Sequence, residues 1–133
     1  MTTDQENSTP RIGMPEKRFG FQRLIPAIVH SLAGLSSALR TEAAFRQEVV
    51  IVSLLTPVAL WLGNTGVERA LLIGSMVLVL IVELLNTAVE NAVNRFGYEY
   101  NELIKAAKDT GSAAVFLSIL LGFFTWASIL LFR

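Results

Sequence analysis

The 133-residue sequence contains no cysteine and one histidine, and its 11 basic residues balance its 11 acidic ones. The absence of cysteine excludes disulfide bonds and metal sites with cysteine ligands. The balanced charge provides no overall positive field that would attract nucleic acid, so no nucleic-acid partner is expected. What the sequence does contain is apolar: 53% of the residues are hydrophobic and the mean hydropathy is +0.54. These values, at this length, indicate a membrane protein with one domain.

The N-terminal part divides into a polar tail and an amphipathic segment. Residues 1–18 are polar and have no helical period, so we expect a disordered tail followed by a membrane domain over 19–133. Within residues 21–40 the apolar side chains recur at a spacing that approximates one helical face. This segment is too weakly apolar to cross a bilayer, so the prediction is a surface helix at the membrane interface. A short soluble helix packed on its neighbours is the alternative.

Three apolar runs are long enough to cross a bilayer, and they cover about residues 49–67, 70–93 and 111–132. Pro57 is expected to bend or locally open the first of these helices. The polar residues 95–109 are expected to connect the second span to the third. The predicted fold class is therefore an all-α membrane protein, with three transmembrane helices preceded by an amphipathic interfacial helix.

Local patterns predict how the first span begins and where aromatic anchors lie. Thr41 is predicted to cap the next helix, with Glu42 in its first turn. Arg46 follows Glu42 by four residues, which is a favourable spacing for an ion pair on a helix. Trp61 and Trp126 are expected to be membrane-interface anchors, because tryptophan is enriched at that depth.

The distribution of positive charge predicts the orientation, because cytoplasmic loops of membrane proteins carry an excess of lysine and arginine. One side has Arg40, Arg46, Arg95, Lys105 and Lys108, and the other side has Arg69 and Arg133. The N-terminus and the 95–109 loop are therefore predicted to be cytoplasmic. Glu42, Glu90, Lys108 and Asp109 then share the cytoplasmic interface, where nucleotide and metal are available.

A polar stripe runs along the second span. At about 100° per residue, Glu83, Asn86, Glu90 and Asn94 fall within a narrow sector of one helix. Ionisable groups at membrane depth are costly, and this favours a functional site. A polar seam between helices is the alternative, because small and polar residues hold membrane helices together. The small residues 111–114, which open the third span, also permit close helix contact.

Acidic, amide and lysine side chains that meet at an interface suit a divalent cation and phosphate. Mg²⁺ usually takes one or two carboxylates together with substrate phosphates, and lysine neutralises phosphate as a point charge. Glu83, deeper in the span, is placed to take a proton from a lipid hydroxyl. The sequence contains neither a P-loop nor the protein-kinase signature set, so any phosphoryl transfer uses a different scaffold. Conduction of protons or cations along the stripe is the alternative.

Three blocks of the sequence, in register, resemble a known family. The blocks are Glu83-Leu-Leu-Asn86-Thr-Ala-Val-Glu90, Glu42-Ala-Ala-Phe-Arg-Gln-Glu48 and Ala107-Lys108-Asp109-Thr-Gly111-Ser112-Ala-Ala114. Over about residues 20–130 the chain resembles the small integral-membrane diacylglycerol kinases of bacteria. The resemblance implies a homotrimer in the inner membrane with sites shared between subunits. It also implies transfer of the ATP γ-phosphate to the primary hydroxyl of diacylglycerol, which gives phosphatidate.

The resemblance further implies roles for single residues. Glu83 matches the family's proton acceptor, and Asn86 matches a polar helper beside it. Glu42 and Glu90 match the carboxylates that hold Mg²⁺ and the nucleotide phosphates. The other ATP-binding positions are Arg23, His30, Glu99, Tyr100, Asn101, Lys108 and Asp109. The lipid-lining positions are Glu83, Ala44, Phe45, Arg46, Gln47, Glu48, Trp61, Leu62, Gly63, Asn64, Arg69 and Ser112.

Two positions depart from the expected family pattern, and two alternatives stay open. Asn94 stands where an aspartate is expected one turn beyond Glu90, and His30 stands where an aromatic residue is expected near the nucleotide. The related undecaprenol kinases share the Glu-x-x-Asn-x-x-x-Glu core, although the Glu42–Glu48 block favours diacylglycerol. A trimeric channel or structural membrane protein is the alternative from a different class.

Overall fold

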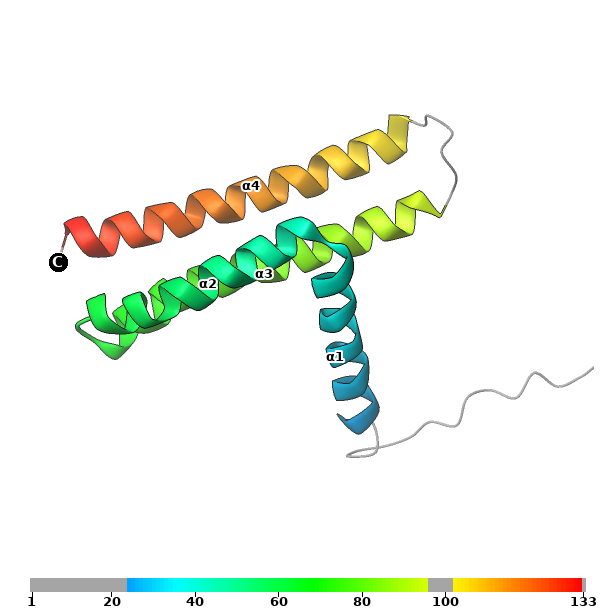
Figure 1. The fold of residues 1–133 in the computed structure, drawn as a ribbon. Helices are drawn as coiled ribbons and strands as arrows, with labels where there is room; N and C mark the ends of the chain where they lie inside the picture. The colour runs from blue at the N-terminus through cyan, green and yellow to red at the C-terminus, as the bar shows by residue number, and fades with distance from the viewer. Residues whose placement is uncertain (1–23, 96–101, 133) are drawn as a thin grey trace, which may run out of the picture. The chain divides into compact units, whose positions relative to one another are not determined.

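The computed structural model describes residues 24–95 and 102–132. Within them the chain forms α1 (Leu24–Thr41), α2 (Ala43–Leu62), α3 (Gly66–Asn94) and α4 (Glu102–Leu131) (Figure 1). The predicted tail and four of the predicted ATP-binding positions, Arg23, Glu99, Tyr100 and Asn101, lie outside the described residues. The chain separates into two compact units, the first ending at Ala33 and the second beginning at Gly34. The second unit therefore contains α2, α3 and α4.

Three helices are long and apolar enough to cross a membrane: α2 with 20 residues, α3 with 29 and α4 with 30. Over the described residues, this confirms the prediction of an all-α chain with three candidate membrane-spanning helices. Helix α2 continues through Pro57 without interruption. Helix α4 begins at Glu102, so Lys105, Lys108 and Asp109 belong to its first turns rather than to the predicted 95–109 connection. The reason is local, because Glu, Leu, Lys and Ala are strong helix formers and Glu102 suits the positive end of the helix dipole.

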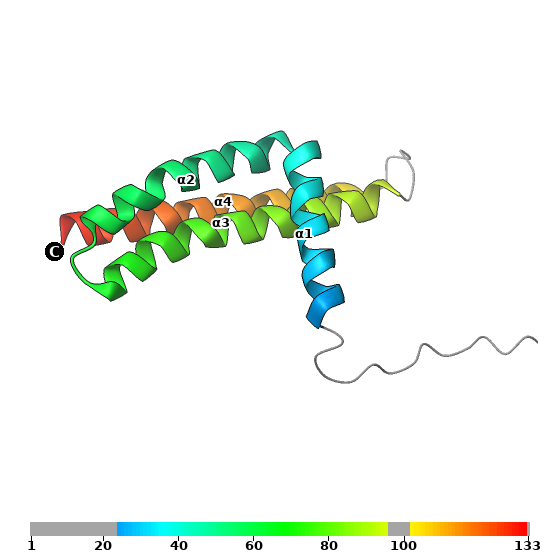
Figure 2. The same ribbon diagram turned by 60° about the horizontal axis from the view of Figure 1, so that its bottom comes forward.

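Helix α3 packs against both α2 and α4, and its contact with α4 is the more extensive. Both neighbours run antiparallel to it (Figure 1 and Figure 2). The buried core consists of Ala59, Leu72 and Met76. Trp126 packs against this core, and its indole Nε1–H donates to the carbonyl oxygen of Leu72 at 3.2 Å. A partly buried indole has thus found its partner on the neighbouring helix, and the interfacial depth of Trp126 stays a prediction.

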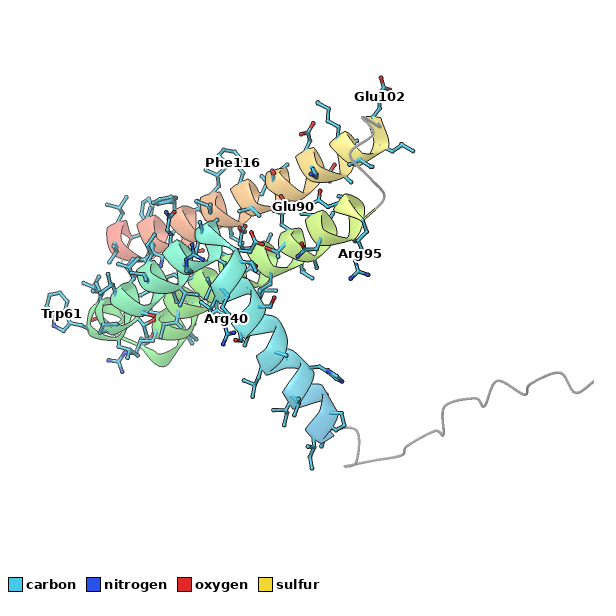
Figure 3. The ribbon with its side chains drawn as sticks, turned by 45° about the vertical axis from the view of Figure 1, so that its right-hand side comes forward. Arg40, Trp61, Glu90, Arg95, Glu102 and Phe116 are labelled. Carbon is cyan, nitrogen blue, oxygen red and sulfur yellow. The ribbon has the colours of Figure 1, made fainter. Side chains whose placement is uncertain are left out.

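Most large apolar side chains of α2, α3 and α4 point away from this small core. Leu54 is 66% exposed and Phe123 is 71% exposed. Phe116, on α4, projects outward (Figure 3). An apolar surface of this extent is stable only against lipid or further protein.

The junction between α1 and α2 differs from the prediction. Thr41 ends α1, and the N-cap of α2 is Glu42, whose side chain makes no capping hydrogen bond. Arg46, predicted to pair with Glu42, donates instead from Nη1 to the carbonyl oxygens of Leu39 at 3.3 Å and Arg40 at 3.1 Å. The last carbonyl groups of α1 have no partners within the helix, so they are good acceptors for the Arg46 guanidinium. An ion pair between Arg46 and Glu42 at the surface would contribute little by comparison.

The turn between α2 and α3 is held by several hydrogen bonds to the backbone. Thr65 caps α3, because its Oγ1 accepts from the backbone N–H of Glu68 at 3.1 Å. The Glu68 carboxylate accepts in turn from the backbone N–H of Asn64 at 2.9 Å, a variant of the capping box. Arg69 Nε donates to the carbonyl oxygen of Gly63 at 2.9 Å. A Cβ at Gly63 would stand 2.6 Å from Arg69 Cγ, so this turn leaves no room for a side chain there.

Candidate active site

The polar stripe predicted on the second span lies on α3 and is built from residues three and four positions apart. Glu83 is buried, with 8% of its surface exposed, and Asn86 and Glu90 are half-buried. Asn86 Nδ2 donates to Glu90 Oε1 at 3.1 Å, as neighbours on one helical face can. Figure 3 shows Glu90 near one end of α3 and Trp61 at the opposite end of the α2–α4 helices.

Four carboxylates from α2 and α3 gather around this stripe. Glu83 interacts electrostatically with Glu90 and with Glu42, the N-cap of α2. Glu48, one and a half turns into α2, interacts electrostatically with Glu83. Like charges this close repel one another, and a bound cation would offset the repulsion. The arrangement therefore favours cation binding near Glu42, Glu83 and Glu90.

The spacing of these acids limits how a metal could bind. Among residues 24–95 and 102–132, no group of three or more acidic or histidine side chains could hold a metal ion. Mg²⁺ does not need such a group, because one or two carboxylates and substrate phosphates usually complete its shell. The pair Glu42 and Glu90 fits this donor set, and Glu90 is oriented by its hydrogen bond to Asn86.

Helix α4 meets the stripe at Gly111. A Cβ placed on Gly111 would collide with Asn86 Oδ1 and would lie 3.3 Å from Asn86 Cγ. Asn86 Oδ1 is buried, and it has no hydrogen-bond partner in the described part of the chain. The close contact predicted for the small residues 111–114 is thus confirmed at Gly111.

An apolar cavity of about 330 Å³ lies between α2, α3 and α4. The lining residues are Glu48, Ile51, Val52 and Leu55 on α2, Met76 and Val79 on α3, and Ile119, Gly122, Phe123 and Trp126 on α4. Glu48 is the ionisable group in this lining, and its Oε2 is buried without a hydrogen-bond partner among the residues described. Val79 precedes Glu83 by one helical turn, so the cavity begins beside the carboxylates and leads away from them along the helices.

The first turns of α4 carry the lysine and aspartate predicted to contact nucleotide. Asp109 forms an ion pair with Lys105, with 2.9 Å between Nζ and Oδ2, and both side chains are more than half exposed. Lys108 is half-buried. An exposed pair of this kind contributes about 0–1 kcal/mol, so a charged ligand can readily replace it. Lys105 was not predicted as the partner of Asp109, although the four-residue spacing was a usable signal.

The other predicted site residues lie in different surroundings. His30 is exposed on α1 in the first unit, and Asn94 is exposed at the last position of α3. Ser112 is exposed on α4, while Phe45 is 2% exposed and packs inside the chain. Of the rest of the predicted lipid-lining set, Ala44, Arg46 and Gln47 are exposed on α2. The others lie at or beside the α2–α3 turn, at the opposite end of α3 from Glu90: Trp61, Leu62, Gly63, Asn64 and Arg69. A single chain therefore does not bring these turn residues to Glu90.

Two features of the site had no signal in the sequence. Gly111 was recognised as small, but nothing local told which residue of α3 it faces. Glu48 was assigned through resemblance alone, and its place beside Glu83 depends on the packing of α2 against α3. Both features come from the way separate helices meet, which a periodicity cannot report.

Three apolar helices, with a set of carboxylates at one end and an apolar cavity beside them, fit a membrane protein. The family model described as prokaryotic diacylglycerol kinase matches residues 29–130, and the chain belongs to that family. Membership makes the chain a kinase and removes the channel or structural protein as its primary role.

Proteins named diacylglycerol kinase from several bacteria are similar to most of the chain. The Escherichia coli strain K12 protein is 48% identical over 117 residues, which cover 88% of this chain and 96% of that protein. The Pseudomonas aeruginosa protein is 49% identical over 112 residues, covering 84% and 91%. The Haemophilus influenzae protein is 44% identical over 116 residues, covering 87% and 98%.

Proposed function

We propose that this chain transfers the γ-phosphate of ATP to the primary hydroxyl of diacylglycerol, which gives phosphatidate and ADP. One observation carries the proposal: the buried carboxylate of Glu83 stands between two different environments on one helix. Towards the end of α3, the Asn86–Glu90 pair offers polar groups. In the other direction, Val79 lines an apolar cavity. A water-soluble nucleotide and a lipid hydroxyl would meet at Glu83.

In the proposed reaction Glu83 is the general base. Its carboxylate accepts the proton of the lipid hydroxyl while the hydroxyl oxygen forms a bond to the γ-phosphorus. The bond from the γ-phosphorus to the bridging oxygen breaks, and ADP leaves with that oxygen. Much of the rate enhancement in phosphoryl transfer comes from positioning and charge neutralisation, and the hydrogen bond from Asn86 to Glu90 contributes positioning.

Glu42 and Glu90 would hold Mg²⁺, the cofactor of this proposal, together with the ATP phosphates. When bound, the ion neutralises charge on the phosphates. Glu42 Oε1 accepts a hydrogen bond from Thr41 Oγ1 at 3.1 Å, and Glu90 Oε1 accepts one from Asn86. Each carboxylate is thereby oriented and has further lone pairs for ligands. Lys108 and Asp109 on α4 are the proposed nucleotide contacts on the polar side of the site.

The apolar cavity supports a lipid as the phosphate acceptor. Its volume falls within the range of small-molecule pockets, and its lining is almost wholly apolar. Undecaprenol, a single-chain lipid alcohol, is the second candidate, because the same cavity would admit an isoprenoid chain.

The exposed apolar surfaces support a proposed assembly, and the distribution of lysine and arginine supports a proposed topology. We propose a homotrimer in the bacterial inner membrane, with the N-terminus and the segment 95–109 on the cytoplasmic side and a membrane domain over 19–133. Helix α1 would lie at the membrane interface, because its apolar residues, among them Ile25 at 70% and Leu32 at 61%, are exposed. Neighbouring subunits would cover apolar surface of α2–α4 and complete the sites.

A panel of lipid alcohols tests the proposal. The purified protein would be incubated with Mg²⁺ and labelled ATP and with diacylglycerol, monoacylglycerol, undecaprenol or no lipid, each in mixed micelles. We expect label in phosphatidate at the highest rate, and no transfer when Mg²⁺ is chelated. Preferential labelling of undecaprenol would show that undecaprenol, and not diacylglycerol, is the phosphate acceptor. ATP consumption without any labelled lipid would overturn the proposal.

A further inference from the structure

The contact between α3 and α4 at the polar stripe is unusual, because it places a side-chain amide against a residue with no side chain. Asn86 is on α3, and Gly111 is on α4. A Cβ on Gly111 would overlap Asn86 Oδ1 and stand 3.3 Å from Asn86 Cγ. No rotation of a methyl group relieves such an overlap, so either the Asn86 amide or one of the two helices would have to move. Gly111 therefore provides a slot that the amide fills.

The amide nitrogen of Asn86 sets the orientation of the amide against Gly111. Asn86 Nδ2 donates to Glu90 Oε1 at 3.1 Å. The opposite orientation would turn the amide oxygen towards a carboxylate, and two acceptors repel. The amide oxygen therefore faces Gly111, where it is buried without a hydrogen-bond partner in the described residues. A buried amide oxygen without a partner is unfavourable and calls for an explanation.

We infer that Gly111 is a positioning residue, whose missing side chain lets α4 hold the Asn86 amide so that it orients the Glu90 carboxylate. The unpaired oxygen follows from that arrangement, since the amide nitrogen is committed to Glu90 and the oxygen is confined against the helix backbone. The inference rests on the proposed function only in assigning Glu90 to the binding of Mg²⁺ and the ATP phosphates. The steric coupling between Gly111 and Asn86 stands on the geometry alone.

We expect the shift in unfolding temperature caused by Gly111→Ala to change sign when the Asn86 side chain is removed. Glycine inside a helix is ordinarily less stable than alanine, so a harmless Gly→Ala change raises the unfolding temperature. Gly74 on α3 is the matched control, since a Cβ there meets nothing within 4 Å. We expect Gly74→Ala to raise or keep the unfolding temperature of the detergent-solubilised protein and Gly111→Ala to lower it. In an Asn86→Ala background, we expect Gly111→Ala to raise it instead.

Equal lowering by Gly111→Ala in both backgrounds would overturn the inference, because the clash would then not involve Asn86. If Asn86→Ala fails to give folded protein, Asn86→Ser provides the shortened background and the same comparison. This arm of the experiment uses no substrate, so it is independent of the proposed function.

A kinetic arm separates positioning from mere packing. With diacylglycerol and Mg²⁺-ATP, we expect Gly111→Ala to lower kcat about 100-fold, the effect typical of a displacement near 1 Å. We also expect it to raise the Mg²⁺ concentration needed for half-maximal activity, while Gly74→Ala keeps both values. Folded Gly111→Ala protein with unchanged kcat and Mg²⁺ dependence would overturn the positioning role. An inactive wild type in this assay would instead count against the proposed function.

Discussion

Near the α2–α3 turn, Thr65, Glu68 and Arg69 all hydrogen-bond to backbone groups. At the carboxylate site near the other end of the same helices, Glu48 Oε2 and Asn86 Oδ1 are buried without partners in the described residues. Both regions involve α2 and α3. At the turn, these polar side chains form hydrogen bonds with backbone groups close to them in sequence. The carboxylate site leaves acceptors unpaired and brings acidic groups within electrostatic range.

The difference indicates that the α2–α3 turn stabilises the fold and that the carboxylate site binds a ligand or a partner. Each buried acceptor without a partner costs about 1–3 kcal/mol, which a fold has no reason to retain for stability alone. A bound cation, a hydroxyl donor or a neighbouring subunit would remove this cost. Substitutions at the turn should therefore affect folding, and substitutions at the carboxylate site should affect catalysis.

The largest expected effect is at Glu83. Glu83→Gln keeps the shape of the side chain but cannot accept a proton, so we expect phosphatidate formation to fall about 10²–10⁴-fold. The size of the solubilised assembly, measured by light scattering, should stay that of the wild type. Retention of most of the activity would show that another group accepts the proton.

A smaller effect is expected for the carboxylates assigned to Mg²⁺. Glu42→Ala and Glu90→Ala should each raise the Mg²⁺ concentration for half-maximal activity by about 10–100-fold, the range seen when metal-site partners are lost. Glu102→Ala, at the exposed start of α4, is the matched control and should leave the value unchanged. Equal effects at all three positions would point to a general loss of negative charge.

The smallest effect is expected at the turn. Thr65→Ala removes the cap of α3, so the free energy of unfolding should fall by about 1 kcal/mol with kcat unchanged. Unfolding in mixed detergent would give the first value and the lipid assay the second. A matching loss of kcat would show that the turn and the carboxylate site are coupled.

The sequence predicted those features that depend on residues close together along the chain. The three apolar runs identified the membrane-spanning helices, and the spacing of Glu83, Asn86 and Glu90 placed them on one face of α3. Helix ends were harder, because Thr41 was predicted to cap the next helix and residues 95–109 to form a connection without knowledge of which groups compete there. Thr41 ends α1 rather than capping α2, and α4 starts before its apolar run.

Features that depend on two helices meeting were not predictable. The indole N–H of Trp126 reaches the Leu72 carbonyl, 54 residues away in sequence, and no local pattern predicted this contact. Gly111 belonged to a stretch of small residues, and its relation to Asn86 required the rotation and depth of α4 against α3. Helical periodicity reports the face of one helix and carries no information on its register against another.

The depth of Glu83 has an energetic consequence for the proposed reaction. Glu83 precedes Glu90 by seven residues, a distance of about 10 Å along the helix axis. Moving an acyl chain from hydrocarbon to water costs about 0.8 kcal/mol per methylene group, so a chain of about 15 methylenes would require about 12 kcal/mol. A base set this far below the polar end of α3 lets the lipid react while its chains stay in hydrocarbon, and the extraction free energy never enters the activation barrier.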